Sequence, residues 1–79
     1  MENLTRLKKN ELQRIFRSEF GEKCLNWAIY VDFKKQDYID KIREKEQYEN
    51  CEDEVLRNRI EKTWRKQFEP LLECIKRFT

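Results

Sequence analysis

The sequence predicts an all-α fold, a small bundle of three or four helices in a single helical domain over residues 1–79. Glycine and proline occur once each, as Gly21 and Pro70, and the stretches between them are rich in residues that favour helix. Apolar residues also recur every three or four positions within these stretches. A chain of 79 residues holds one hydrophobic core and is too short for a second domain with its own core.

The first helix is expected over residues 6–20. Its apolar residues repeat on one helical face, and they are Leu12, Ile15, Phe16 and Phe20. Gly21 then stands where a left-handed C-terminal cap is favoured, so the helix should end at Phe20. Its start is open, because either Thr5 or Asn10 can act as the N-cap.

The middle of the chain, residues 22–47, is expected to be helical with a break near Asp32. Residues 25–33 alternate between apolar and polar positions, which is typical of a strand, but Cys24, Ala28 and Val31 fit helical spacing. A lone strand in a helical chain has no partner for its backbone groups, so helix is favoured unless two chains pair. In the second half of this stretch, the spacing of the apolar residues predicts that Tyr38, Ile39 and Ile42 face the core.

The C-terminal part predicts two helices, over residues 51–68 and 70–78. Asn50 begins a possible capping box, and the acidic residues that follow suit the positive end of a helix. The apolar positions form an i, i+4 ladder of Leu56, Ile60, Trp64 and Phe68, continued by Leu71, Leu72, Ile75 and Phe78. Pro70 must kink this ladder or restart it from a first-turn position.

Composition excludes several classes of protein. The charges of the 18 basic and 16 acidic side chains nearly cancel, whereas a high net charge is typical of disordered chains. The polar, charged start predicts no signal peptide, and no apolar run is long enough to span a membrane, so an intracellular protein, cytoplasmic or nuclear, is expected. Cys24, Cys51 and Cys74 are too widely spaced for a zinc knuckle and are expected to be reduced, with a single disulfide or an intermolecular one as the alternatives.

The residue types argue against catalysis. The chain has no histidine, so neither a Ser-His-Asp nor a Cys-His arrangement can form. The acidic residues between Glu44 and Glu54 lack the glycine and the ligand alternation of a calcium loop, and one glycine cannot build a phosphate-binding loop. We therefore expect no catalytic residue, no metal site and no cofactor, with a small redox protein as the remaining enzymatic alternative.

Aromatic and basic residues predict two kinds of contact surface. The large apolar residues exceed what so small a chain easily encloses, and those expected to bind a partner are Trp27, Tyr30, Phe33, Trp64, Phe68 and Phe78. Basic residues form outward stripes on the first helix and on the helix after Asn50. The nucleic-acid-binding candidates are Arg6, Lys8, Lys9, Arg14, Arg17, Arg59, Lys62 and Lys66.

Residues 7–43 resemble a SAP-type helix-extended loop-helix module, most closely the SAP-like C-terminal domain of the MANF/ARMET family. The residues that carry the resemblance are Leu7, Glu11, Leu12, Ile15, Phe16, the run from Phe20 to Cys24, Lys35 and the run from Asp37 to Ile42. The resemblance implies DNA binding through Lys8, Lys9 and Arg14, or docking on another protein. The loop here is longer than in that family. The family's Cys-x-x-Cys motif corresponds to Cys24-Leu25-Asn26-Trp27 in this chain, which lacks the second thiol, so the redox role of the motif does not carry over.

Two functions follow as expectations. The first is a non-enzymatic regulatory, adaptor or inhibitor module that binds another protein, or a second copy of itself as a dimer, through an apolar and aromatic surface with polarised charge. The second is a SAP-like DNA-binding or other nucleic-acid-binding module that uses the basic helix faces. A membrane partner is not expected.

Overall fold

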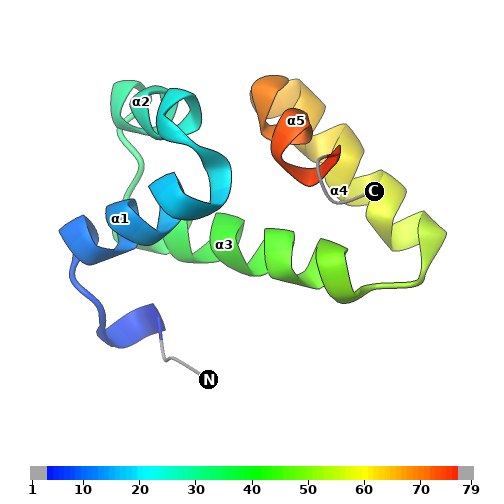
Figure 1. Ribbon diagram of the computed structural model, residues 1–79, viewed down its shortest axis with the longest axis horizontal. Coiled ribbons are helices and arrows are strands. Elements are labelled where there is room, and N and C mark those ends of the chain that lie inside the picture. The colour runs from blue at the N-terminus through cyan, green and yellow to red at the C-terminus, as the bar shows by residue number, and fades with distance from the viewer. Residues whose placement is uncertain (1–3, 77–79) are drawn as a thin grey trace. The chain divides into compact units, whose positions relative to one another are not determined.

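The computed structural model describes the backbone of residues 4–76 and the side chains of residues 4–74 (Figure 1). Its helices are, in chain order, the 3-10 helix η1 (Leu4–Arg6), α1 (Lys9–Phe20), α2 (Glu22–Tyr30), α3 (Lys35–Asn50), α4 (Glu54–Gln67) and α5 (Pro70–Lys76). No strand occurs among these described residues, so the prediction of a small all-α fold is confirmed.

The chain divides into two compact units, Met1–Ile42 and Arg43–Thr79. The first unit contains η1, α1, α2 and the first half of α3, and α1 packs against α2. The second unit contains the second half of α3 together with α4 and α5, which pack against each other. Each unit has its own set of buried apolar side chains.

Helix α1 begins after Lys8, so neither Thr5 nor Asn10 is its N-cap. The backbone N–H of Lys8 donates to a carboxylate oxygen of Glu11 at 3.1 Å, which satisfies a donor that the helix cannot. The helix ends at Phe20, as predicted, and the N–H of Gly21 donates to the carbonyl of Arg17 at 2.8 Å.

Gly21 connects α1 directly to α2. Its backbone has φ of 93° and ψ of 166°, a conformation that is essentially restricted to glycine. Its carbonyl accepts the first hydrogen bond of α2, from the N–H of Leu25 at 3.1 Å. One residue therefore ends one helix and starts the next, and glycine adopts the required backbone without the strain that an L-residue would have there.

Gly21→Ala should lower the free energy of unfolding by about 1–3 kcal/mol, because L-alanine is strained at this φ and ψ. A Cβ on Gly21 would meet no atom within 4 Å, so the loss comes from the backbone and not from a clash. Urea unfolding of the two chains measures it. A synthetic chain with D-alanine at position 21 is the control, and equal losses from L- and D-alanine would contradict the explanation.

The core of the first unit is built around the ring of Phe16. Phe16 stacks on Phe20 at 4.6 Å between centroids and meets Tyr38 edge-on at 5.4 Å. The hydroxyl of Tyr38 accepts a hydrogen bond from the side chain of Gln13 at 3.1 Å, so its polar atom is satisfied. The buried apolar residues of this unit are Leu12, Phe16, Phe20, Cys24, Ala28, Tyr38, Ile39 and Ile42. The prediction that Tyr38, Ile39 and Ile42 face the core is confirmed.

The strand alternative for residues 25–33 is wrong, because α2 is helical from Glu22 to Tyr30. The helix buries Cys24 and Ala28, two of the three positions that fitted helical spacing, whereas Val31 is the C-cap residue and is exposed. The chain then turns over residues 31–34, where the sequence predicted a break near Asp32, and α3 follows from Lys35.

Helix α4 is capped by Asp53, which corrects the prediction that the capping box begins at Asn50. The Asp53 carboxylate accepts the N–H of Val55 at 3.0 Å. Asn50 instead belongs to the last turn of α3, where its side chain donates to the carbonyl of Glu46 at 2.9 Å. The helix therefore starts at Glu54, three residues later than the prediction.

Trp64 is the central residue of the second unit. Its side chain is fully buried, and its indole N–H donates to the carboxylate of Glu44 on α3 at 3.3 Å. The apolar ladder is interrupted after Gln67 and restarts with Pro70 as the first residue of α5, where its missing N–H costs nothing. The other buried apolar residues of this unit are Tyr48, Ile60, Leu71, Leu72 and Cys74. The side chain of Ile75 and the whole of Phe78 lie outside the described residues.

Tyr48 joins α3 to α4 by a partly buried polar contact. Its hydroxyl donates to the carboxylate of Glu61 at 2.9 Å, and the guanidinium of Arg57 lies 4.6 Å from the ring centroid. Burial and the hydrogen bond to Glu61 raise the pKa of Tyr48 above its ordinary value of 10.0. The folded state therefore favours the protonated phenol.

This pKa shift predicts a loss of stability in alkali. The phenol contributes stability below pH 10, its unfolded pKa, and the contribution is lost as the pH rises through the higher folded pKa. Tyr48→Phe should cost about 0.5–1.5 kcal/mol at neutral pH through the lost hydrogen bond. Melting curves of both chains from neutral pH to about pH 11 should show this difference shrinking above pH 10. A constant difference across the range would contradict the role of the phenol.

Candidate functional site: an exposed apolar corner after α2

Helix α2 ends in a Schellman motif. The N–H of Phe33 donates to the carbonyl of Ala28 at 2.9 Å, and the N–H of Asp32 donates to the carbonyl of Ile29 at 3.1 Å. These two bonds satisfy carbonyl groups that would otherwise lack partners at the end of the helix. The motif requires a left-handed residue at the position of Asp32, and Asp32 has φ of 60°.

Asp32 occupies a position that glycine usually takes. Aspartate tolerates a left-handed backbone better than most L-residues do. It is nevertheless more strained in that conformation than glycine is. The following residue, Phe33, packs edge-on against Trp27 at 5.1 Å between centroids, which is the apolar contact that accompanies this motif. The turn is therefore fixed by backbone hydrogen bonds and by one aromatic anchor.

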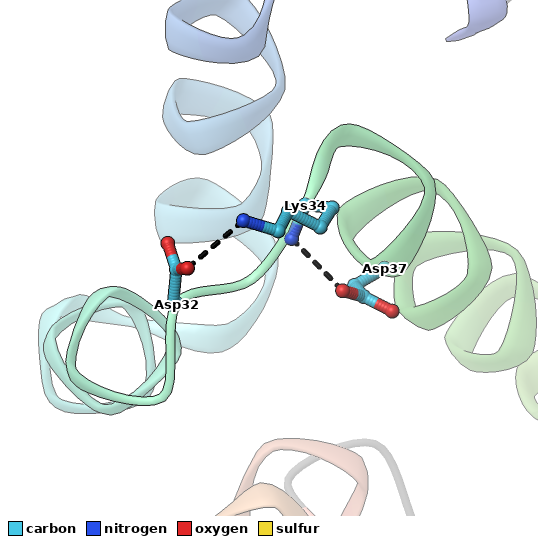
Figure 2. Close-up of polar contacts among 3 residues, drawn as sticks. All are labelled: Asp32, Lys34 and Asp37. Carbon is cyan, nitrogen blue, oxygen red and sulfur yellow. Dashed lines mark hydrogen bonds and ion pairs between the residues drawn. The ribbon is translucent and has the colours of Figure 1, made fainter.

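Lys34 links the turn to the start of α3. Figure 2 shows its side chain reaching back to the Asp32 carboxylate while its backbone nitrogen faces Asp37. The ammonium lies 2.9 Å from the Asp32 carboxylate, and the backbone N–H donates to Asp37 at 2.8 Å. The hydrogen bond and the charge of Lys34 lower the pKa of Asp32 and, reciprocally, raise the pKa of Lys34. The turn thus carries an ion pair at neutral pH.

Three consecutive apolar side chains precede this turn and are exposed. The exposed fractions are 54% for Ile29, 87% for Tyr30 and 45% for Val31. We call these three residues the corner patch. Exposed apolar residues are ordinary when they are scattered, whereas these three are consecutive at the end of α2. Successive helical side chains point about 100° apart, so Tyr30 projects between its two aliphatic neighbours. The side chains of the corner patch are suited to apolar contact, and the phenol of Tyr30 is their one hydrogen-bonding group.

Substitutions at Asp32 separate the backbone from the ion pair. Asp32→Gly should melt at a temperature about 5 °C higher than Asp32→Ala, because glycine adopts the left-handed conformation without strain. Lys34→Ala should shift the melting temperature by only about 1–2 °C, because both partners of the ion pair are exposed. Thermal melts monitored by circular dichroism test both statements. If Lys34→Ala were as damaging as Asp32→Ala, the ion pair would be holding the turn.

The structure places the predicted partner-binding residues in different environments. Tyr30 is exposed, Trp27 and Phe33 are half-buried within the first unit, and Phe68 is half-buried after α4. Trp64 is fully buried because its ring fills the interior between α4 and its neighbours, so it offers no contact surface. Phe78 lies outside the described residues.

Sequence reasoning missed Ile29 and Val31 as members of the corner patch. Both were included in the apolar pattern but not in the set of contact residues. A signal was present, because the apolar residues of 27–31 cover every direction around a helix and a single core can bury only one side. The buried side is the one that contains Ala28.

The predicted nucleic-acid-binding residues are all exposed. The residues are Arg6, Lys8, Lys9, Arg14 and Arg17 in the first unit, and Arg59, Lys62 and Lys66 on α4. On α1, Arg14 and Arg17 lie away from the buried face formed by Leu12 and Phe16. Their exposure is compatible with binding and equally with a solvated helix face.

The cysteines and the potential metal ligands of the described residues do not form a second site. Cys24 and Cys74 are buried, Cys51 is half-buried, and none forms a disulfide with another described residue. Within residues 4–76, no three potential metal ligands of the histidine, cysteine, aspartate or glutamate type gather. In the same described part of the chain, no helix combines the length and apolar character needed to cross a bilayer.

No protein-family model, curated protein or solved structure matches this chain. The resemblance of residues 7–43 to a SAP-type module therefore stays a prediction. Where that module has an extended loop, this chain has helix α2 and a short turn. The three residues that the resemblance implies for DNA binding, Lys8, Lys9 and Arg14, are exposed.

Proposed function

We propose that this chain is a non-enzymatic protein-interaction module whose contact surface is centred on the corner patch. The observation that supports this most directly is Tyr30, a large aromatic residue with an exposed fraction of 87% between two exposed aliphatic residues. Tyrosine is enriched among residues that dominate binding energy, because it buries a large area and also offers a hydroxyl.

The corner patch is preorganised for binding. The Schellman hydrogen bonds and the Phe33 contact with Trp27 fix the backbone next to the patch, so little chain entropy is lost on association. Burying what remains exposed of Ile29, Tyr30 and Val31 contributes on the order of 3 kcal/mol. Association itself costs at least about 4 kcal/mol, so the patch needs surrounding polar contacts from the partner.

The corner patch is smaller than a complete protein–protein interface. A stable interface, with a different protein or with a second copy, buries about 800 Å² per partner, which is more than three side chains supply. We infer a different protein as the partner, with an apolar pocket that receives Tyr30 and a rim that contacts the charged residues of the turn, Asp32 and Lys34. A second copy that met this chain through the same patch would present another exposed Tyr30 where a pocket is needed.

Photo-crosslinking tests the position of the contact. The chain is made with benzoylphenylalanine in place of Tyr30, and a second chain carries it in place of Ser18, an exposed residue of α1. After irradiation in a lysate of the source cells, the probe at position 30 should give a discrete adduct that the probe at position 18 does not. The partner is identified by mass spectrometry of that adduct.

Competition makes the crosslinking result specific to the corner patch. Excess unlabelled wild-type chain should suppress the adduct, and the Tyr30→Ser chain should compete at least tenfold less well, since the anchor ring is lost. Tyr30→Ser should leave the melting curve nearly unchanged, because the side chain is exposed. Adducts of equal yield from both positions, or equal competition by both chains, would contradict the proposal.

A further inference from the structure

A second surface, on α4, carries four exposed basic side chains. Its basic residues are Arg59, Lys62, Arg65 and Lys66, and all four are exposed. We call them the α4 cationic face. It lies opposite Ile60 and Trp64, which α4 buries in the second unit. Arg65 was absent from the predicted nucleic-acid set, and helical geometry places it at the edge of the same face.

The charges of the α4 cationic face are not neutralised by the protein. No described carboxylate forms an ion pair with any of these four residues. Glu61, the acidic residue nearest in sequence, is half-buried and accepts the hydroxyl of Tyr48 at 2.9 Å. The acidic residues at the N-terminal end of α4 precede Arg59, the first residue of the α4 cationic face. The face is therefore a compact region of positive potential on a chain of small net charge.

The α4 cationic face is long enough to contact more than one phosphate of a duplex. Arg59 and Lys66 are seven residues apart on α4, which is about 10 Å along the helix axis. Each basic residue that contacts a phosphate neutralises one charge, so the four cations account for three to four phosphates. An open hollow of ≈ 580 Å³ beside Arg59, Lys62 and Arg65 is also lined by Val55, Asn58 and Glu61.

The neighbouring side chains distinguish a duplex from other anionic partners. Single strands bind largely through bases stacked on aromatic rings, and the described α4 cationic face has no aromatic residue beside it. A membrane-surface helix presents large apolar side chains next to its cations. On α4 those side chains, Ile60 and Trp64, are buried, and Val55 is the exposed apolar residue.

We infer that the α4 cationic face binds the phosphodiester backbone of duplex nucleic acid without reading its sequence. The contact is electrostatic and involves three to four phosphates, so its strength falls steeply with salt. It uses residues outside the corner patch, so it stands or fails independently of the protein-interaction function.

Fluorescence anisotropy with labelled duplexes of about 20 base pairs, one DNA and one RNA, tests this inference across about 50–200 mM salt. The plot of log K against log salt for DNA should have a slope of about −3, and affinity should fall about 60-fold over this range. The double variant Arg59→Glu with Lys62→Glu should bind at least tenfold more weakly at low salt, with a slope smaller in magnitude by about 2.

The matched control is Lys23→Glu with Lys35→Glu, two exposed residues of the first unit outside the nucleic-acid-binding set, which produces the same change in net charge. It should keep the slope of the wild-type chain, and circular dichroism should show all three chains equally folded. Tight binding to either duplex with this pattern supports the inference, whichever backbone is preferred. No duplex binding at low salt, equal losses in both double variants, or preferential binding to single strands or to anionic lipid vesicles would overturn it.

Discussion

The aromatic ring of Phe33 holds the corner between α2 and α3 in place. It packs against Trp27, and it lies 5.3 Å from Tyr38 and 6.1 Å from Phe16 between ring centroids, so it joins α2, α3 and α1 within the first unit. The backbone N–H of the same residue closes the last turn of α2. Because one residue supplies both the cap and the anchor, the direction in which the chain leaves α2 is fixed.

The two proposed surfaces work by different physics. The corner patch gains free energy by removing apolar area from water, and this contribution changes little with salt. The α4 cationic face gains free energy by releasing counterions, and salt weakens it directly. The two lie in separate units of the chain, so a partner protein at Tyr30 and a duplex at Arg59 use different parts of the molecule.

Local stereochemistry explains which features could be predicted from the sequence. The ends of helices at Gly21 and before Pro70 follow from the backbone preferences of these two residues alone. The cap at Asp53 could not be predicted in the same way, because Asn50 is an equally good cap until one knows that α3 continues through it. The burial of Trp64 depends on the packing of α4, and a helical pattern shows a ladder without showing which of its aromatic residues remain exposed.

The exposure of Tyr30 can be measured directly, and the proposed contact surface depends on it. A soluble paramagnetic agent broadens the NMR signals of aromatic rings that it can approach, and the chain has three tyrosines to compare. The ring of Tyr30 should broaden strongly, while those of Tyr38 and Tyr48 should not, because both are buried. If the Tyr30 ring were as protected as the other two, the corner patch would be core and could not receive a partner.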